Sequence, residues 1–254
     1  MPYVKEEAAE EVVTLLEVED LRKSYGKKVV IDDLSFSIDR GECYALIGRN
    51  GIGKSTTIDC IVGLKEKDSG HCRIYGFDQD KDPLSYKANF GYCSSEPVAY
   101  ECMTGKEYLT FIASAYGMIK GAFDENYEAL KQSFNFPEED ITRRIGEYSH
   151  GMKQKICLMG SLIHNPDVWI LDEPTVGLDI MVYQILVKTA KAFLQNGKAI
   201  LLTSHSIEFI NEISTKVAIL DDGGIARNLN IKENPYLKKD LYHIFFELYE
   251  DKKG

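Results

Sequence analysis

Short apolar segments alternate with helical patterns along most of this chain. The apolar segments span residues 168–171, 199–202 and 216–220, and an earlier one spans 43–47. Their length and continuous apolarity are typical of strands that are buried on both faces of a parallel sheet. Helical spacing of apolar residues separates them, as in the helix expected to end at Gly63. The pattern therefore predicts an α/β fold with a parallel core sheet.

Two regions depart from this alternation. A strand pattern begins at Leu15, and residues 34–38 alternate apolar and polar side chains, which is typical of an antiparallel strand with one buried face. Helical periodicity replaces strand signals after Thr104, which has capping-box spacing to Glu107. We expect an antiparallel β subdomain and a helical subdomain inserted at about residues 97–148.

The expected organisation is an acidic N-terminal extension (1–13), one main domain (14–226) and a C-terminal helical tail (227–254). Two helical faces that contain aromatic residues are interpreted as packing surfaces. One face, in the inserted subdomain, is interpreted as subdomain core in preference to a docking face and comprises Tyr108, Phe111, Ile112, Ala115 and Tyr116. The other, in the tail, is expected to pack on its own domain or on another subunit and comprises Leu241, Ile244, Phe245, Leu248 and Tyr249.

A glycine-rich segment joins the first buried strand to the first helix. It matches a phosphate-binding loop, in which backbone N–H groups and the positive helix end surround a polyphosphate. Lys54 would reach the β/γ oxygens, and the Ser55 hydroxyl would bind Mg²⁺. A chance match would occur in on the order of one such chain in a hundred. The candidate nucleotide-binding residues here are Gly48, Asn50, Gly51, Gly53, Lys54, Ser55 and Thr56.

Two carboxylates follow the apolar segment 168–171. They are Asp172 and Glu173, and they fall at the carboxyl edge of the predicted sheet, where open α/β sheets bind ligands. Asp172 can hold the water shell of Mg²⁺, and Glu173 can polarise an attacking water. The alternative is that both carboxylates only cap the chain before Pro174.

Charge and composition limit the functions that are possible. The formal net charge of −10 argues against a nucleic-acid surface, which is usually basic. The six scattered cysteines and the lack of a signal peptide indicate reduced thiols in the cytosol. No apolar run approaches the roughly 20 residues that a membrane helix needs, so a role at a membrane would require another subunit.

The joint order of these motifs resembles the nucleotide-binding subunits of ABC transporters over about residues 15–220. Residues 148–154 resemble the signature motif of that family, and residues 177–179 resemble its D-loop. His205 stands where the switch histidine belongs, and Tyr25 where an aromatic residue stacks on adenine. Within the family the chain is most similar to the Ecs-type ATPases of Gram-positive bacteria. That finer similarity rests on Asp82-Pro83, on residues 97–100, on Tyr116-Gly117, on residues 151–155 and on residues 240–242.

The resemblance implies an ATPase subunit that uses ATP and Mg²⁺ to power a membrane transporter, expected to be an exporter. Two chains, identical or related, would sandwich two ATP molecules. Lys54, Glu173 and His205 of one chain would act with Ser149 and Gly151 of the other. As the N-cap of a helix, Ser149 would expose N–H groups to a γ-phosphate. The partner would be an integral-membrane permease, with this chain on the cytoplasmic face of the plasma membrane.

The chain departs from the family pattern at two positions. His150 replaces the first glycine of the signature, either as an exposed residue at a helix start or as a pH sensor. The usual glutamine after Gly91-Tyr92 is missing; Ser95 aligns with it, and the neighbouring Glu96 is our candidate for the metal contact. The roles assigned to Tyr25 and His205 also have structural alternatives. Each could instead be an ordinary core residue, because aromatic residues and histidines are often buried in protein cores.

Two other functions compete with a transporter ATPase. One is an ABC ATPase that acts on DNA or ribosomes, but the chain has one cassette, an acidic charge and no room for a long coiled coil between Lys54 and Ser149. The other is a non-catalytic member that uses ATP as a conformational switch. Glu173 and His205 argue against that function, whereas the missing glutamine keeps it open.

Overall fold

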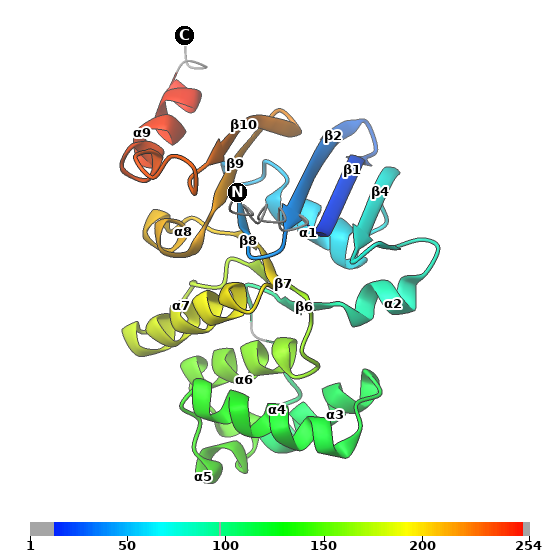
Figure 1. Ribbon diagram of the computed structural model, residues 1–254, viewed down its shortest axis with the longest axis vertical. Helices are drawn as coiled ribbons and strands as arrows, with labels where there is room; N and C mark the ends of the chain where they lie inside the picture. The colour runs from blue at the N-terminus through cyan, green and yellow to red at the C-terminus, as the bar shows by residue number, and fades with distance from the viewer. Residues whose placement is uncertain (1–12, 97, 251–254) are drawn as a thin grey trace, which may run out of the picture.

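The computed structural model describes residues 13–96 and 98–250. The predicted acidic extension, apart from Val13, lies outside the described residues. Figure 1 shows a β-rich upper part, a central sheet and a group of helices at the opposite end. No described helix is both long enough and apolar enough to cross a membrane.

A six-stranded sheet forms the centre of the molecule, in the order β10-β9-β3-β8-β7-β6. Its inner neighbours pair in parallel, and only β10 pairs antiparallel, to β9. This confirms the predicted parallel core sheet. The strands are β3 (Cys43–Ile47), β6 (Phe90–Cys93), β7 (Val168–Asp172), β8 (Ala199–Thr203), β9 (Lys216–Asp221) and β10 (Gly224–Asn230).

Side chains of the central strands point alternately to the two faces of the sheet and divide the core into two layers. In β3, Cys43, Ala45 and Ile47 pack into one apolar cluster, whereas Tyr44 and Leu46 pack into the other. Successive side chains of a strand point to opposite faces, so a fully apolar strand fills both layers. The continuous apolar runs in the sequence are thereby explained.

A second, four-stranded antiparallel sheet has the order β2-β1-β4-β5. Its strands are β1 (Thr14–Tyr25), β2 (Lys28–Asp39), β4 (Ser69–Ile74) and β5 (Phe77–Asp78). In β2, Leu34, Phe36 and Ile38 are buried while Ser35 and Ser37 are exposed. This is the alternation that the sequence predicted for a strand with one buried face.

The inserted helices lie together at one end of the molecule (Figure 1). They are α3 (Gly105–Ala115), α4 (Lys120–Ser133), α5 (Glu138–Ile141) and the short 3₁₀ helix η1 (Ile145–Glu147). Of these, α3 and α4 pack on α6 (His150–Leu162), and α5 packs on α3. Thr104 and Glu107 form the predicted capping box. Gly91 lets α6 approach β6, because a Cβ at this residue would lie 1.7 Å from the Ser161 carbonyl oxygen.

The aromatic face of α3 differs from our prediction. Tyr108 is buried, but Phe111 and Tyr116 are 47% and 39% exposed, so the face is not simply subdomain core. The buried side of α3 is instead formed by Gly105, Tyr108, Leu109 and Ala113. Close contact with α6 selects that side, since a Cβ at Gly160 would meet Ile112 and Tyr108 at 2.8 and 3.0 Å.

The C-terminal region contains a strand that the sequence analysis missed. β10 runs through position 226, where we placed the end of the main domain, because its polar residues give an edge strand little apolar signal. In the tail, Leu241 is buried and Ile244 packs on the core, as predicted for these two residues. The side chains of Phe245, Leu248 and Tyr249 lie outside the described part of the structure. The remaining helices are α1 (Lys54–Val62), α2 (Pro83–Ala88), α7 (Ile180–Gln195), α8 (Ile207–Ile213) and α9 (Leu237–Glu250).

Candidate functional site

The glycine-rich loop leads from the end of β3 directly into α1. Gly51 and Gly53 have φ of +77° and +120°, which side-chain-bearing residues rarely adopt. A Cβ at Gly53 would also lie 3.0 Å from the Val30 carbonyl oxygen. Gly53 is the N-cap and gives no side-chain cap to α1, so the helix presents backbone N–H groups at this end. Such a helix end is suited to an anion.

Lys54 turns back over this loop. Its Nζ donates to the carbonyl oxygens of Gly48 and Arg49 at 2.9 and 3.3 Å. The side chain is nearly buried, at 6% exposure. Burial lowers the pKa of the Lys54 ammonium, against the opposing effect of the nearby carboxylates of Glu173 and Asp172. The lysine is therefore held inside the site and not on the open surface.

Asp172 lies beside the start of α1. Its Oδ1 accepts hydrogen bonds from Ser55 Oγ at 3.2 Å and from Thr203 Oγ1 at 2.5 Å. The carboxylate is buried. Thr203 did not figure among our candidates, although it faces Asp172 across the β7–β8 pairing. Ser55 and Asp172 bring a hydroxyl and a carboxylate together, and both are the oxygen ligands that Mg²⁺ prefers.

Glu173 follows Asp172 with φ of +50°, a conformation that is uncommon outside glycine. Its backbone N–H donates to the Thr203 hydroxyl and carbonyl. Its carboxylate oxygens lie 3.1 Å from the backbone nitrogen and from Nε2 of His205. Burial raises the pKa of the Glu173 carboxyl, against the opposing effects of His205 and Lys54. Strain and burial at a sheet edge are frequent at functional positions.

His205 joins the loop to the carboxylates. Its Nε2 also lies 3.4 Å from Lys54 Nζ. The structure thus brings together four of our candidates from three separate segments. Those candidates are Lys54, Asp172, Glu173 and His205.

The signature residues form a second group. Ser149 is the N-cap of α6, and its Oγ accepts from Met152 N at 3.3 Å, which confirms the predicted helix start. Gly151 lies against the first turn of α7, where a Cβ would meet Asp179 Oδ2 at 3.2 Å. Asp179 in turn caps α7 through Val182 N. The contacts of Ser149 and Gly151 are thus with the α6 and α7 starts and not with Lys54.

Tyr25 and Glu96 are both on the surface. Tyr25 is 47% exposed, which removes the interpretation of a simple core tyrosine, and its ring lies near the ammonium groups of Lys23 and Lys65 at 5.4 and 5.9 Å. Glu96 is exposed in the segment that follows β6. Cys93 pairs with Leu171, so this segment leaves the sheet beside Asp172.

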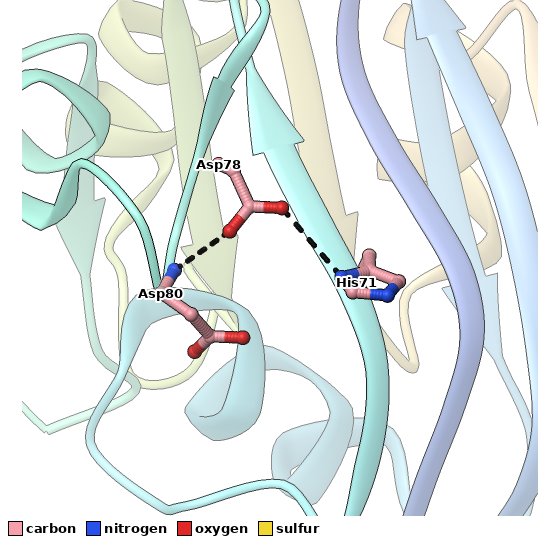
Figure 2. Close-up of side chains that lie close together, drawn as sticks. All are labelled: His71, Asp78 and Asp80. Carbon is pink, nitrogen blue, oxygen red and sulfur yellow. Dashed lines mark hydrogen bonds and ion pairs between the residues drawn. The ribbon is translucent and has the colours of Figure 1, made fainter.

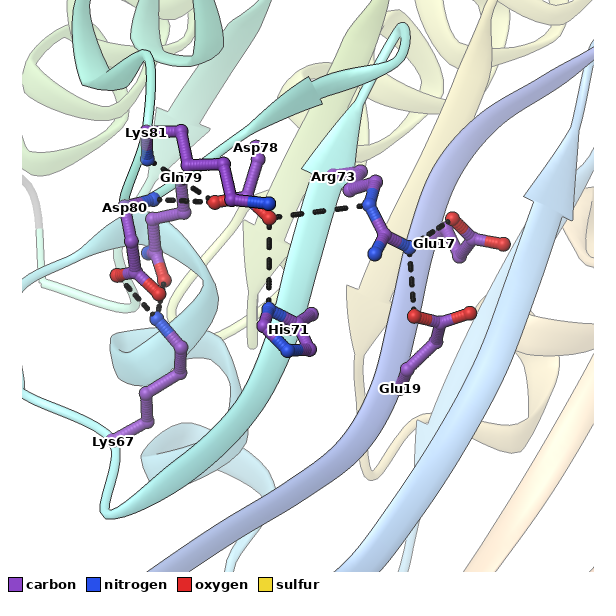
Figure 3. A network of polar contacts seen from close by, with 9 residues as sticks. All are labelled: Glu17, Glu19, Lys67, His71, Arg73, Asp78, Gln79, Asp80 and Lys81. Carbon is purple, nitrogen blue, oxygen red and sulfur yellow. Dashed lines mark hydrogen bonds and ion pairs between the residues drawn. The ribbon is translucent and has the colours of Figure 1, made fainter.

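A polar network on the four-stranded sheet includes a possible metal-ligand set. The ligand atoms of His71, Asp78 and Asp80 lie within 4.8 Å of one another (Figure 2). Figure 3 shows, however, that cations already engage these carboxylates. Lys67 Nζ lies 2.7 Å from Asp80, and Arg73 Nε lies 3.9 Å from Asp78.

The same network has a structural explanation. Asp78 Oδ1 accepts hydrogen bonds from the backbone nitrogens of Asp80 and Lys81, which fixes the turn after β5. A metal ion would have to displace the neighbouring cations before it could bind here. We therefore assign the network to the fold.

An apolar groove of about 540 Å³ lies between α3, α6 and the end of β6. Its walls include Phe111, Tyr116 and Val98, the last of which is 76% exposed. The ring of Tyr116 stacks on His164 at a centroid distance of 3.7 Å. Burial lowers the pKa of His164 to about 4, so this imidazole is neutral near pH 7. The misassigned face of α3 is thus one wall of an open groove.

Known proteins share both the sequence and the fold. Residues 31–176 match the family described as ABC transporter. The SkfA peptide export ATP-binding protein SkfE of Bacillus subtilis is 34% identical over 86% of this chain and 90% of its own length. The ABC-type transporter ATP-binding protein EcsA of the same organism is 30% identical over 95% and 99%. A solved ATP-binding subunit of an ABC transporter superposes with a TM-score of 0.81 at 34% identity, over 87% of this chain and 91% of that one.

Proposed function

Because the chain belongs to the ABC transporter family, as one of its ATP-binding and ATP-hydrolysing subunits, we propose that the residues around Lys54 carry the reaction. The observation that supports this assignment most is the convergence of Lys54, Asp172, Glu173 and His205 from separate segments. Structural roles alone would not require two carboxylates, a lysine and a histidine to converge at one edge of the sheet.

The loop and Lys54 bind the polyphosphate. Free N–H groups at the start of α1 face the anion, and the Lys54 ammonium gives up its contacts with Gly48 and Arg49 to reach the phosphate oxygens. Asn50 and Thr56 belong to the same phosphate-binding segment. Tyr25 offers an exposed ring for the adenine base.

Ser55 and Asp172 would hold Mg²⁺. Their oxygens already meet at 3.2 Å, and Thr203 orients the carboxylate by donating to the same oxygen. When bound, the ion would neutralise charge on the transferred phosphate. Glu96, on the segment that leaves the sheet beside Asp172, would contact the water shell of the ion, with Ser95 as the alternative.

Glu173 acts as the general base. Its carboxylate accepts a proton from the attacking water, and His205, 3.1 Å away, holds it in place through a side-chain and a backbone contact. Ser149 and Gly151 lie in the other group of residues, at the start of α6, where Gly151 contacts the start of α7. They would contact the nucleotide of a second chain, identical or related, so that two chains enclose two nucleotides.

The membrane partner would dock in the apolar groove. Exposed apolar side chains that line a groove are typical of a binding site. An integral-membrane permease would insert an apolar segment against Phe111, Tyr116 and Val98. This chain would then lie at the cytoplasmic face of the plasma membrane. The relatives include a protein named for peptide export, which favours an exporter.

Nucleotide binding tests the site directly. Lys54→Met keeps side-chain length and removes the charge, so we expect the dissociation constant for ATP to rise about 10- to 100-fold, as loss of a charged hydrogen bond implies. Isothermal titration measures this dissociation constant, and thermal denaturation shows whether the variant is folded. Lys191→Met, at an exposed ion pair with Glu212, is the control and should bind normally. Unchanged affinity in folded Lys54→Met would contradict the proposed site.

A further inference from the structure

The first turn of α6 lies directly on the loop that leads from Glu173 to α7. A Cβ placed on Gly177 would be 2.9 Å from His150 Nε2 and 3.4 Å from its Cδ2. The exposed imidazole therefore lies against the glycine, and a Cβ at this residue would force the His150 side chain to shift. Gly177 also has φ of +71°, which favours glycine.

The neighbouring residue contacts the other end of the same loop. Gly151 faces Asp179 Oδ2, while Asp179 Oδ1 accepts from Val182 N at 2.9 Å and so begins α7. His150 and Gly151 thus contact the two ends of the segment 177–179. Gly177 and Asp179 are exposed, and these two contacts join the segment to the start of α6.

The segment is tied in turn to Glu173. Val176 N donates to the Glu173 carbonyl at 3.3 Å, and Leu178 N donates to the Thr175 carbonyl at 3.4 Å. These two turns fix the position of Gly177 relative to Glu173. The imidazole contact with Gly177 and these two turn hydrogen bonds therefore connect His150 with the residue whose carboxylate contacts His205.

We propose that His150 is a positioning residue for ATP hydrolysis, which sets the placement of the Glu173 carboxylate through its contact with Gly177. The start of α6 would thereby control the general base of its own chain. The inference rests on the proposed role of Glu173. A glycine at position 150, as in the motif that the segment resembles, has no side chain to make this contact.

Gly177→Ala tests the contact, because the added Cβ pushes on Nε2 of His150. We expect kcat to fall about 10- to 100-fold, since a displacement of about 1 Å can cost that much, while the dissociation constant for ATP changes less than about twofold. Gly197→Ala is a matched control, with φ of +71° and a Cβ position 3.1 Å from Arg40 Cδ. It should carry a similar backbone strain and keep kcat within about twofold of wild type.

The double variant His150→Gly/Gly177→Ala separates positioning from strain. It removes the clash but keeps the unfavourable φ, so kcat should recover by about three- to tenfold over Gly177→Ala. His150→Gly alone should lower kcat by about the same factor, with ATP affinity unchanged. No recovery in the double variant, or a kcat for Gly177→Ala that equals that of Gly197→Ala, would overturn the inference. Glu173→Gln, assayed in parallel, distinguishes the two proposals: full activity there would contradict the role of Glu173 itself.

Discussion

At the residue scale, the most informative position is Glu173. It combines a positive φ, a largely buried carboxylate and two contacts with His205. Burial is the main cause of its raised pKa, because removal from water disfavours the charged form. Such a carboxylate holds its proton to higher pH than an exposed one and is a stronger base when it is ionised.

This environment predicts a pH dependence. The proposed general base must be ionised, so kcat/KM for ATP should fall with decreasing pH through the raised pKa of the Glu173 carboxyl. The acidic limb should therefore lie above the ordinary glutamate pKa of about 4.3. Steady-state rates across pH measure the limb, and binding of a non-hydrolysable ATP analogue over the same range separates it from titration of the nucleotide. A limb at the ordinary glutamate value would contradict this account.

Sequence patterns could predict those candidate site residues that lie together on one continuous segment of the chain. The loop from Gly48 to Lys54 follows a buried strand and precedes a helix, so its geometry is local. The contact between Thr203 and Asp172 instead depends on the register of two strands, which their own patterns do not specify. The contact between His150 and Gly177 likewise requires the packing of α6 against the loop before α7.

At the scale of elements, α3 shows how far periodicity can be used. Its start and capping box were predicted from Thr104 and Glu107, because caps are local. The part of its apolar face that is buried was not predicted. It depends on α6, which contacts Tyr108 and Ile112 and leaves Phe111 exposed. An apolar stripe defines a helix face, but only the neighbouring helices determine which part of it is covered.

The exposed part of α3 predicts an effect on partner binding. Phe111→Asp places a charge in the apolar groove, and loss of one buried aromatic contact of about 1.5–3 kcal/mol should weaken docking at least about tenfold. The measurement is the fraction of the tagged chain that sediments with membranes of its own organism. Tyr236→Asp, at another exposed aromatic residue, is the control and should behave as wild type. If Phe111→Asp changes neither the membrane-bound fraction nor the ATP affinity, the groove is excluded as the docking site.

At the scale of the whole molecule, the candidate residues fall into two groups. Lys54, Asp172, Glu173 and His205 lie together at the carboxyl edge of the six-stranded sheet. Ser149 and Gly151 lie at the start of α6, against the start of α7. A single chain thus presents two separate groups, and in the proposed dimer two chains in opposite orientations would supply both groups to each nucleotide.

Glu173→Gln tests the central claim most directly, because it keeps the size of the side chain and removes its basicity. Hydrolysis should fall about 10²- to 10⁴-fold, the usual effect of losing a positioned base, with ATP binding intact. Slow hydrolysis should then trap two chains around two nucleotides, so size-exclusion chromatography with Mg-ATP should show a dimer for Glu173→Gln and mostly monomer for wild type. Glu212→Gln, at an exposed glutamate, should match wild type. Hydrolysis by Glu173→Gln at the wild-type rate would contradict the account.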